Sequence, residues 1–139
     1  MPNNQIHKSL LIAVDFDGTI VKNAYPKIGK EQLFAFDTLK KLQNAGHRLV
    51  LWTVRSGKAL DEAITYCKSN GVEFYAINNT YPEEVFSSKI SRKIVADIFI
   101  DDRNIGGFIG WGAIHQLVLG ETKNTREKKS FLGKLFSKQ

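Results

Sequence analysis

Short apolar runs alternate with polar loops along the first hundred residues. Residues 9–14 are a continuous apolar run that ends at Asp15-Phe16-Asp17-Gly18, which is typical of a buried central strand opening into a loop. Residues 48–52, 74–77 and 96–100 are three further strand candidates, and the turn-rich residues 78–82 follow the second of them. The pattern therefore predicts four short, buried strands.

Two helices are predicted between these strands. In residues 30–45 the apolar side chains recur at helical spacing, and Gly46 follows where a left-handed C-terminal cap is common. A second helix is predicted over residues 58–70, again closed by a glycine, Gly71. The glycine-dense residues 106–112 match neither a dinucleotide-binding nor a P-loop pattern, and we interpret them as a loop at the rim of a site.

Alternation of strand and helix predicts the fold class. It is typical of an α/β, doubly wound (Rossmann-like) fold with a mostly parallel sheet and helices on both faces. In such a sheet the carboxyl ends of the strands meet at one edge, where ligands bind. The polar segments that follow the predicted strands all lie at that edge.

The length of 139 residues is that of one domain, which we assign to residues 1–120. Residues 121–139 contain six basic and two acidic residues, which is +4 of the chain's net charge of +6. Their apolar members Phe131, Leu132, Leu135 and Phe136 recur at helical spacing, so we interpret this segment as a basic amphipathic tail. A solvated tail, docking on the domain, a homo-oligomer contact, and weak contact with nucleic acid or an anionic membrane all remain open.

Composition excludes several classes of protein. With 42% hydrophobic and 24% charged residues the chain is near the globular average, which argues against wholesale disorder or a fibrous rod. The single cysteine, Cys67, provides neither a disulfide nor a zinc site, and no apolar run approaches the length of a membrane span. We therefore expect a cytoplasmic protein.

Two acidic pairs stand out: Asp15 with Asp17, and Asp101 with Asp102. Each pair follows a predicted strand, so all four carboxyl groups are expected at one edge of the sheet. Ionised carboxylates share a site only with a cation or with raised pKa values. Hard oxygen donors without cysteine or clustered histidine favour Mg²⁺ over zinc, so the sequence predicts a magnesium site.

The same residues resemble the haloacid dehalogenase superfamily. Residues 11–19, Leu-Ile-Ala-Val-Asp-Phe-Asp-Gly-Thr, are similar to its first signature motif. Residues 49–53 look like the second motif, a strand ending in Ser or Thr, and residues 98–102 look like the acidic fourth motif, in the family's order. The third motif is a single basic residue, for which Lys93 fits best, with Lys89 and Arg92 as competitors.

The resemblance implies a role for each matching residue. Asp15 would attack phosphorus and form an aspartyl-phosphate, and Asp17 would protonate the leaving group and then deprotonate the hydrolytic water. Thr53 and Lys93 would hold the phosphoryl oxygens. For Mg²⁺ the implied ligands are Asp15, the backbone carbonyl of Asp17, and one acid of the last pair.

Some of these assignments leave alternatives. We take Asp102 as the direct metal ligand, and we expect Asp101 to support the site without binding the ion or to orient a metal-bound water. Gly18 and Thr19 of the first motif are assigned to substrate binding. Arg55 is also assigned there because it could hold a second anionic group of the substrate bidentately, with a surface ion pair as the alternative.

The expected function is that of a magnesium-dependent phosphatase, an enzyme that hydrolyses phosphomonoesters. Members of the family usually carry an inserted cap domain, and the spacing of the motifs here leaves little space for one, so the chain looks like a capless member with an open site. The expected substrate is a phosphorylated small molecule or a macromolecular phosphate end. A non-catalytic phosphate- or nucleic-acid-binding module on the same fold is the alternative. A response-regulator receiver is disfavoured because its acidic pair and its phosphoacceptor Asp come in a different order along the chain.

Overall fold

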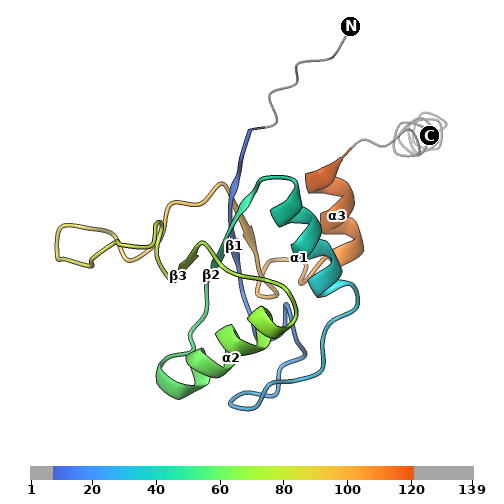
Figure 1. The fold of residues 1–139 in the computed structure, drawn as a ribbon, viewed down its shortest axis with the longest axis horizontal. Coiled ribbons are helices and arrows are strands. Elements are labelled where there is room, and N and C mark those ends of the chain that lie inside the picture. The colour runs from blue at the N-terminus through green and yellow to red at the C-terminus, as the bar shows by residue number, and fades with distance from the viewer. Residues whose placement is uncertain (1–7, 121–139) are drawn as a thin grey trace, which may run out of the picture.

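The computed structural model describes residues 8–120, and the predicted basic tail lies outside them. Four strands form one sheet in the order β3-β2-β1-β4: β1 (Leu11–Val14), β2 (Arg48–Leu51), β3 (Ala76–Ile77) and β4 (Ile98–Ile100). Every neighbouring pair is parallel, with β1 in the centre between β2 and β4 (Figure 1). The predicted α/β class and parallel sheet are confirmed.

Within residues 8–120, three helices accompany the strands: α1 (Ala35–Asn44), α2 (Gly57–Ser69) and α3 (Trp111–Leu119). The glycines expected to close the first two helices are in the left-handed region, at φ +91° for Gly46 and +87° for Gly71. The predicted helix over 30–45 begins later, at Ala35, because Phe34 before it is left-handed at φ +65°. Helix α3 follows the glycine-dense loop and was not predicted.

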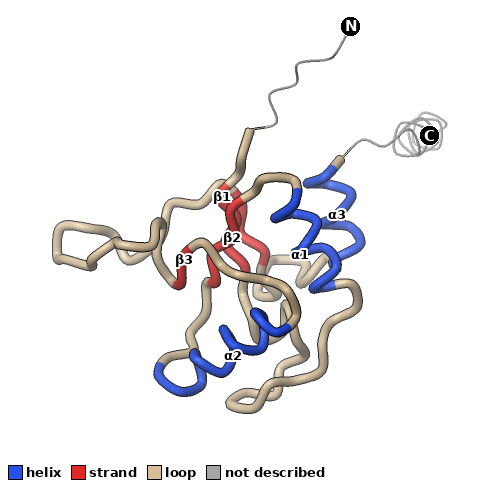
Figure 2. The backbone as a smooth tube through the Cα atoms, viewed as in Figure 1, coloured by secondary structure: helices blue, strands red, loops and turns tan. Residues whose placement is uncertain are grey.

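The alternation of side chains along the strands divides the core into two clusters. Ile12, Val14, Leu49 and Leu51 point to the face that α1, α2 and α3 cover, where Phe36, Cys67 and Trp111 are buried with them. Leu11, Ala13, Val50 and Ala76 point to the opposite face, where Ile94 is buried against them. In Figure 2 the helices α1 and α3 lie together on one side of the strands.

Helices on both faces were expected, and for residues 8–120 that detail is wrong. The connections β1 to β2 and β2 to β3 step across the sheet in one direction, whereas β3 to β4 steps back past two strands. Right-handed crossovers in opposite directions lie on opposite faces. The returning connection, residues 78–97, contains no helix, and its Ile94 and Ala96 pack on the second face (Figure 1).

Residues 8–120 contain no inserted cap domain. The long connection that follows β1 is an irregular loop up to Phe34, and residues 78–97 are irregular throughout. The edge at which β1, β2 and β4 end is therefore covered only by loops. None of the helices described in this part of the chain has the length and apolar character needed to cross a membrane.

Candidate active site

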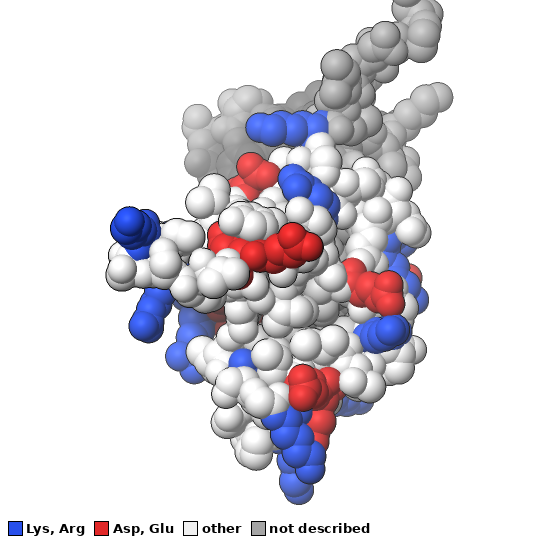
Figure 3. Space-filling view, turned by 60° about the vertical axis from the view of Figure 1, so that its left-hand side comes forward, with Lys and Arg blue, Asp and Glu red and all other residues white. Residues whose placement is uncertain are grey.

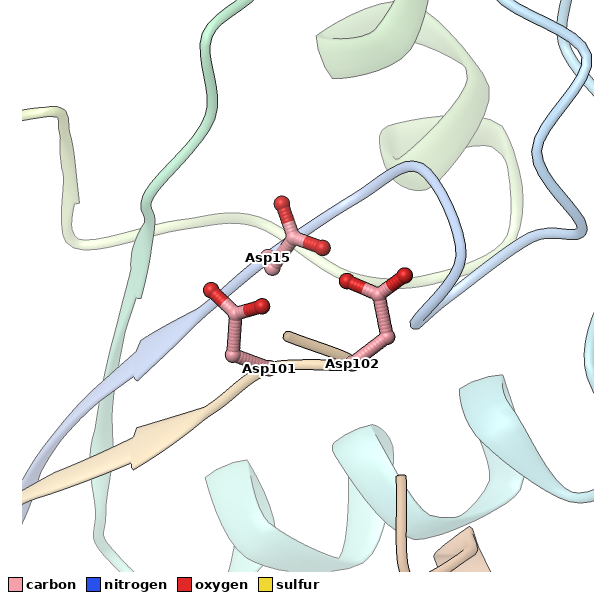
Figure 4. Close-up of side chains that lie close together, drawn as sticks. All are labelled: Asp15, Asp101 and Asp102. Carbon is pink, nitrogen blue, oxygen red and sulfur yellow. The ribbon is translucent and has the colours of Figure 1, made fainter. Parts of the chain in front are cut away.

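Three carboxyl groups converge at the carboxyl ends of β1 and β4 (Figure 4). Asp15 directly follows β1, and Asp101 and Asp102 directly follow β4, the strand beside it. The backbone N–H of Asp15 donates to the carbonyl of Ile100 at 2.9 Å, which holds the two strand ends together. One ligand oxygen from each of the three acids lies within 4.8 Å of the others, an arrangement that could hold a cation.

The environment of Asp15 opposes its negative charge. Burial is the main cause that raises the pKa of Asp15 from 3.8 to about 7; the Thr19 hydrogen bond lowers it, and Asp101 and Asp102 raise it again. Thr19 donates from Oγ1 to Oδ2 of Asp15 at 2.9 Å. A divalent cation among the three acids would remove much of this electrostatic cost, and three carboxylates are a donor set that suits Mg²⁺.

A glycine makes room for the third acid. Gly18 has φ +86°, and a Cβ placed on it would lie 2.1 Å from Oδ2 of Asp102. Its N–H donates to the carbonyl of Val21 at 2.7 Å, so the backbone here forms a tight turn. Gly18 is therefore required both by its left-handed backbone and by the close approach of Asp102.

Asp17 is not part of the cluster of Asp15, Asp101 and Asp102, and its carboxylate is paired with Arg55 instead. Nε and Nη2 of Arg55 donate to Oδ2 and Oδ1 of Asp17, each at 2.7 Å. The remaining donors go to the carbonyls of Pro26, Lys27 and Ala59, so all five guanidinium N–H groups are used. Ligation of a metal by the Asp17 backbone carbonyl remains a prediction.

Thr53 enters the site from β2. Its backbone N–H donates to Oδ1 of Asn78 at 2.8 Å, and its Oγ1 accepts from the backbone N–H of Arg55 at 3.1 Å. Because Oγ1 acts as an acceptor there, its own proton is available to another oxygen. Asn78 follows β3 with φ +54°; the sequence marked it only as part of a turn.

These groups line one cavity of about 840 Å³ at the carboxyl edge of the sheet. Asp15, Asp101 and Asp102 line it together with Asp17 and Thr53. Its other lining residues come from four loops: Asn23, Tyr25, Trp52, Val54, Asn78, Phe86, Arg92 and Arg103. The carboxyl edge of the sheet therefore holds an open cavity with four acids in its lining.

Comparison with known proteins yields one informative match. No family model matches the chain, and no curated protein matches it. A solved structure, described as that of the conserved protein coded by a locus from Bacteroides thetaiotaomicron, superposes with a TM-score of 0.76 and is 53% identical in sequence. The match covers 85% of this chain and 97% of the Bacteroides chain.

The chain belongs to the family of this Bacteroides protein. A sequence identity of 53% over most of both chains indicates that the two proteins share an ancestor and a fold.

The three basic residues considered for the phosphate lie in different places in this structure. Lys93 is exposed, and its Nζ lies 5.6 Å from the centroid of the Phe99 ring, outside the cavity. Arg92 lines the cavity instead, and Lys89 does not. The role of Lys93 at the phosphate therefore stays a prediction, and Arg92, its competitor, is the basic residue of the three that lines the cavity. Residues 78–97 carry no regular structure from which the direction of a side chain could be predicted.

Two of the residues assigned to substrate binding are buried in this structure. Arg55 is 1% exposed and Thr19 is fully buried. Arg55 donates hydrogen bonds to the Asp17 carboxylate, and the Thr19 hydroxyl donates one to the Asp15 carboxylate. The backbone carbonyl of Thr19 accepts a hydrogen bond from Nε1 of Trp111 at 2.8 Å. The N–H of Gly18 is likewise bound within its own turn.

Surface charge bears on the expected nucleic-acid or membrane contact. On the face shown in Figure 3, the Lys and Arg side chains of the described residues are interspersed with Asp and Glu. This face therefore has no single-sign field to attract a polyanion. The expected nucleic-acid or membrane contact was assigned to residues 121–139, which lie outside the described part of the chain.

Proposed function

We propose that this protein is a magnesium-dependent phosphomonoester hydrolase that acts through an aspartyl-phosphate on Asp15. The observation that carries the proposal is the placement of Asp15: a carboxylate at the end of the central strand, beside two further acids, at the base of an open cavity. The motif order that resembles the haloacid dehalogenase superfamily supports the same conclusion.

Asp15 is the nucleophile in this proposal. The Thr19 hydroxyl and the backbone around Phe16 hold its carboxylate in one orientation at the cavity base. In the first step an oxygen of Asp15 forms a bond to phosphorus, and the bond from phosphorus to the leaving oxygen breaks. The family resemblance assigns Asp17 to protonate that oxygen, for which its carboxylate has to leave the ion pair with Arg55 and take up a proton. In the second step water attacks phosphorus, Asp17 accepts its proton, and phosphate and free Asp15 are released.

The remaining residues stabilise the charge on the phosphoryl group. A Mg²⁺ ion held by Asp15, Asp101 and Asp102 would supply positive charge next to the phosphoryl oxygens. The Thr53 hydroxyl is available to donate a hydrogen bond, and Arg92 replaces Lys93 as the basic residue on the cavity wall. Phosphoryl transfer depends largely on such positioning and charge stabilisation.

The test is hydrolysis of 4-nitrophenyl phosphate with Mg²⁺ by the full chain and by Asp15→Asn. We expect turnover in the wild type that is lost in chelator and lost in Asp15→Asn. The matched control is Asp61→Asn, which changes an exposed carboxylate on α2 and should retain activity. Borohydride trapping followed by mass spectrometry should place the phosphorylated residue at position 15.

Other outcomes would contradict the proposal. Full activity in folded Asp15→Asn would remove Asp15 from the mechanism. Stable phosphorylation without turnover would indicate a receiver-like acceptor. A folded, Mg²⁺-binding chain that hydrolyses no phosphomonoester would favour a binding module instead.

A further inference from the structure

The cavity is much larger than a phosphoryl group requires, and much of its wall is aromatic. Tyr25, Trp52 and Phe86 come from three different segments of the chain and line the same space of about 840 Å³. Tyr25 is 57% exposed and Phe86 is 49% exposed, although both are large apolar side chains. Exposed aromatic groups around a concave site are typical of a surface that binds an apolar or planar ligand.

One of these rings is held in place before any ligand binds. The guanidinium carbon of Arg55 lies 5.2 Å from the centroid of the Tyr25 ring and 4.9 Å from that of Phe16. Arg55 also binds the carbonyls of Pro26 and Lys27, which immediately follow Tyr25. The buried Arg55 therefore fixes residues 25–27 in place, which reduces the conformational entropy lost when a ligand packs against Tyr25.

The cavity also contains one more guanidinium than the proposed chemistry uses. Arg92 and Arg103 both line it, and within residues 8–120 neither guanidinium forms a hydrogen bond or an ion pair. Only the backbone N–H of Arg103 is engaged, with Oδ1 of Asp101 at 2.8 Å. An unpaired guanidinium beside an open site is suited to bidentate binding of a carboxylate or phosphate.

From these observations we infer a substrate class: a phosphomonoester whose leaving group carries a planar ring and a second anionic group. The ring packs among Tyr25, Trp52 and Phe86, Arg92 binds the phosphoryl group that is transferred, and Arg103 binds the second anion. This inference rests on the proposed function, because it assigns the leaving group to the same cavity.

The test compares matched ligands by calorimetric binding and by turnover, with Mg²⁺ present. Phenylphosphonate and 4-carboxyphenylphosphonate differ only in the second anion and bind without being hydrolysed. A charged hydrogen bond contributes about 1.5–3 kcal/mol, so we expect the carboxylated ligand to bind about ten- to a hundredfold more tightly. The corresponding phosphate esters should show the same preference in kcat/KM.

Variants assign that preference to named residues. In Arg103→Gln the ratio of the two affinities should fall to about one, whereas Lys40→Gln, which removes an exposed charge on α1, should keep it. Phenylphosphonate should bind about tenfold more tightly than propylphosphonate, and Phe86→Ala should remove most of that difference.

The outcomes separate this inference from the proposed function. If aryl phosphates are hydrolysed but the carboxylate brings no gain, the substrate class is wrong and the phosphatase assignment stands. A preference that survives in Arg103→Gln would likewise overturn the inference. If the wild type neither binds the phosphonates nor hydrolyses any ester, the proposed function and this inference fail together.

Discussion

Arg55 and Asp17 form a buried bidentate ion pair, with Nε and Nη2 of the guanidinium each 2.7 Å from a carboxylate oxygen. The pair connects the loop after β1 with the loop after β2, and through the carbonyl of Lys27 it also connects the cavity wall. Its geometry makes Arg55 a positioning residue for Asp17. The sequence had assigned Arg55 to the substrate.

Removal of Arg55 should destabilise the fold strongly. Arg55→Ala leaves Asp17 without a partner and three carbonyls without donors, and breaking a buried ion pair in this way costs about 3–5 kcal/mol of unfolding free energy. Urea denaturation measures the loss. The control is Arg48→Ala, because the exposed Arg48 guanidinium lies 5.3 Å from the centroid of the Tyr75 ring and forms no hydrogen bond or ion pair within residues 8–120. Its loss should cost at most about 1 kcal/mol. Equal, small losses in both variants would show that the buried pair is unimportant for stability.

Gly18 should be essential to the metal site rather than to the fold alone. Gly18→Ala and Gly46→Ala both place a side chain at a left-handed position, at φ +86° and +91°, and each should lose about 1–2 kcal/mol of stability. Only at Gly18 does the new Cβ meet Asp102, because nothing lies within 4 Å of that position at Gly46. Calorimetry should therefore detect weaker Mg²⁺ binding only in Gly18→Ala. Unchanged Mg²⁺ affinity in both variants would contradict the placement of Asp102 at the ion.

The cation-free protein should lose stability as the pH rises through the pKa of Asp15. That pKa is raised from 3.8 to about 7 in the folded state, so the folded chain holds a proton that the unfolded chain has released. The stability of the wild type relative to Asp15→Asn is therefore greatest at low pH and falls between about pH 4 and about pH 7. Thermal unfolding of both proteins in chelator measures this difference. A difference that does not change with pH would argue against a buried, crowded carboxyl group at position 15.

Metal binding should show the opposite pH dependence. The ion requires Asp15 as a carboxylate, so below pH 7 the Mg²⁺ affinity should fall, by up to about tenfold for each pH unit. Thr19→Val removes the hydrogen bond that lowers the pKa of Asp15, so in this variant the fall should begin at a higher pH. Calorimetric titrations at several pH values measure the midpoint. Thr38→Val, a change at a buried threonine on α1, should leave the midpoint where it is in the wild type.

The basic residue that acts on the phosphoryl group should be Arg92. Arg92→Gln removes a guanidinium from the cavity and should lower kcat/KM for 4-nitrophenyl phosphate by about a hundredfold or more. Lys93→Gln removes a charge outside the cavity and should stay within about twofold of the wild type. The reverse result, with Lys93→Gln inactive, would mean that residues 78–97 rearrange when substrate binds.

The sequence was sufficient to predict the parallel sheet and the position of three acids at its carboxyl edge. Buried strands of a parallel sheet are continuous apolar runs, and the residue after such a run must lie at the carboxyl edge, so Asp15, Asp101 and Asp102 could be placed together from their positions alone. Gly46 and Gly71 could be recognised as helix ends because few other residues tolerate a left-handed cap. These features depend on local pattern and on rules of chain connection.

Tertiary structure alone decided where the loop side chains point. Nothing local to Arg55 indicates that it turns inward to Asp17, thirty-eight residues earlier in the chain, or that Arg92 rather than Lys93 faces the cavity. Helix α3 was missed because it is short and nearly uniformly apolar, without a polar face to give a period. The direction of a side chain in a loop is set by contacts with distant segments, and those contacts exist only once the sheet has brought the segments together.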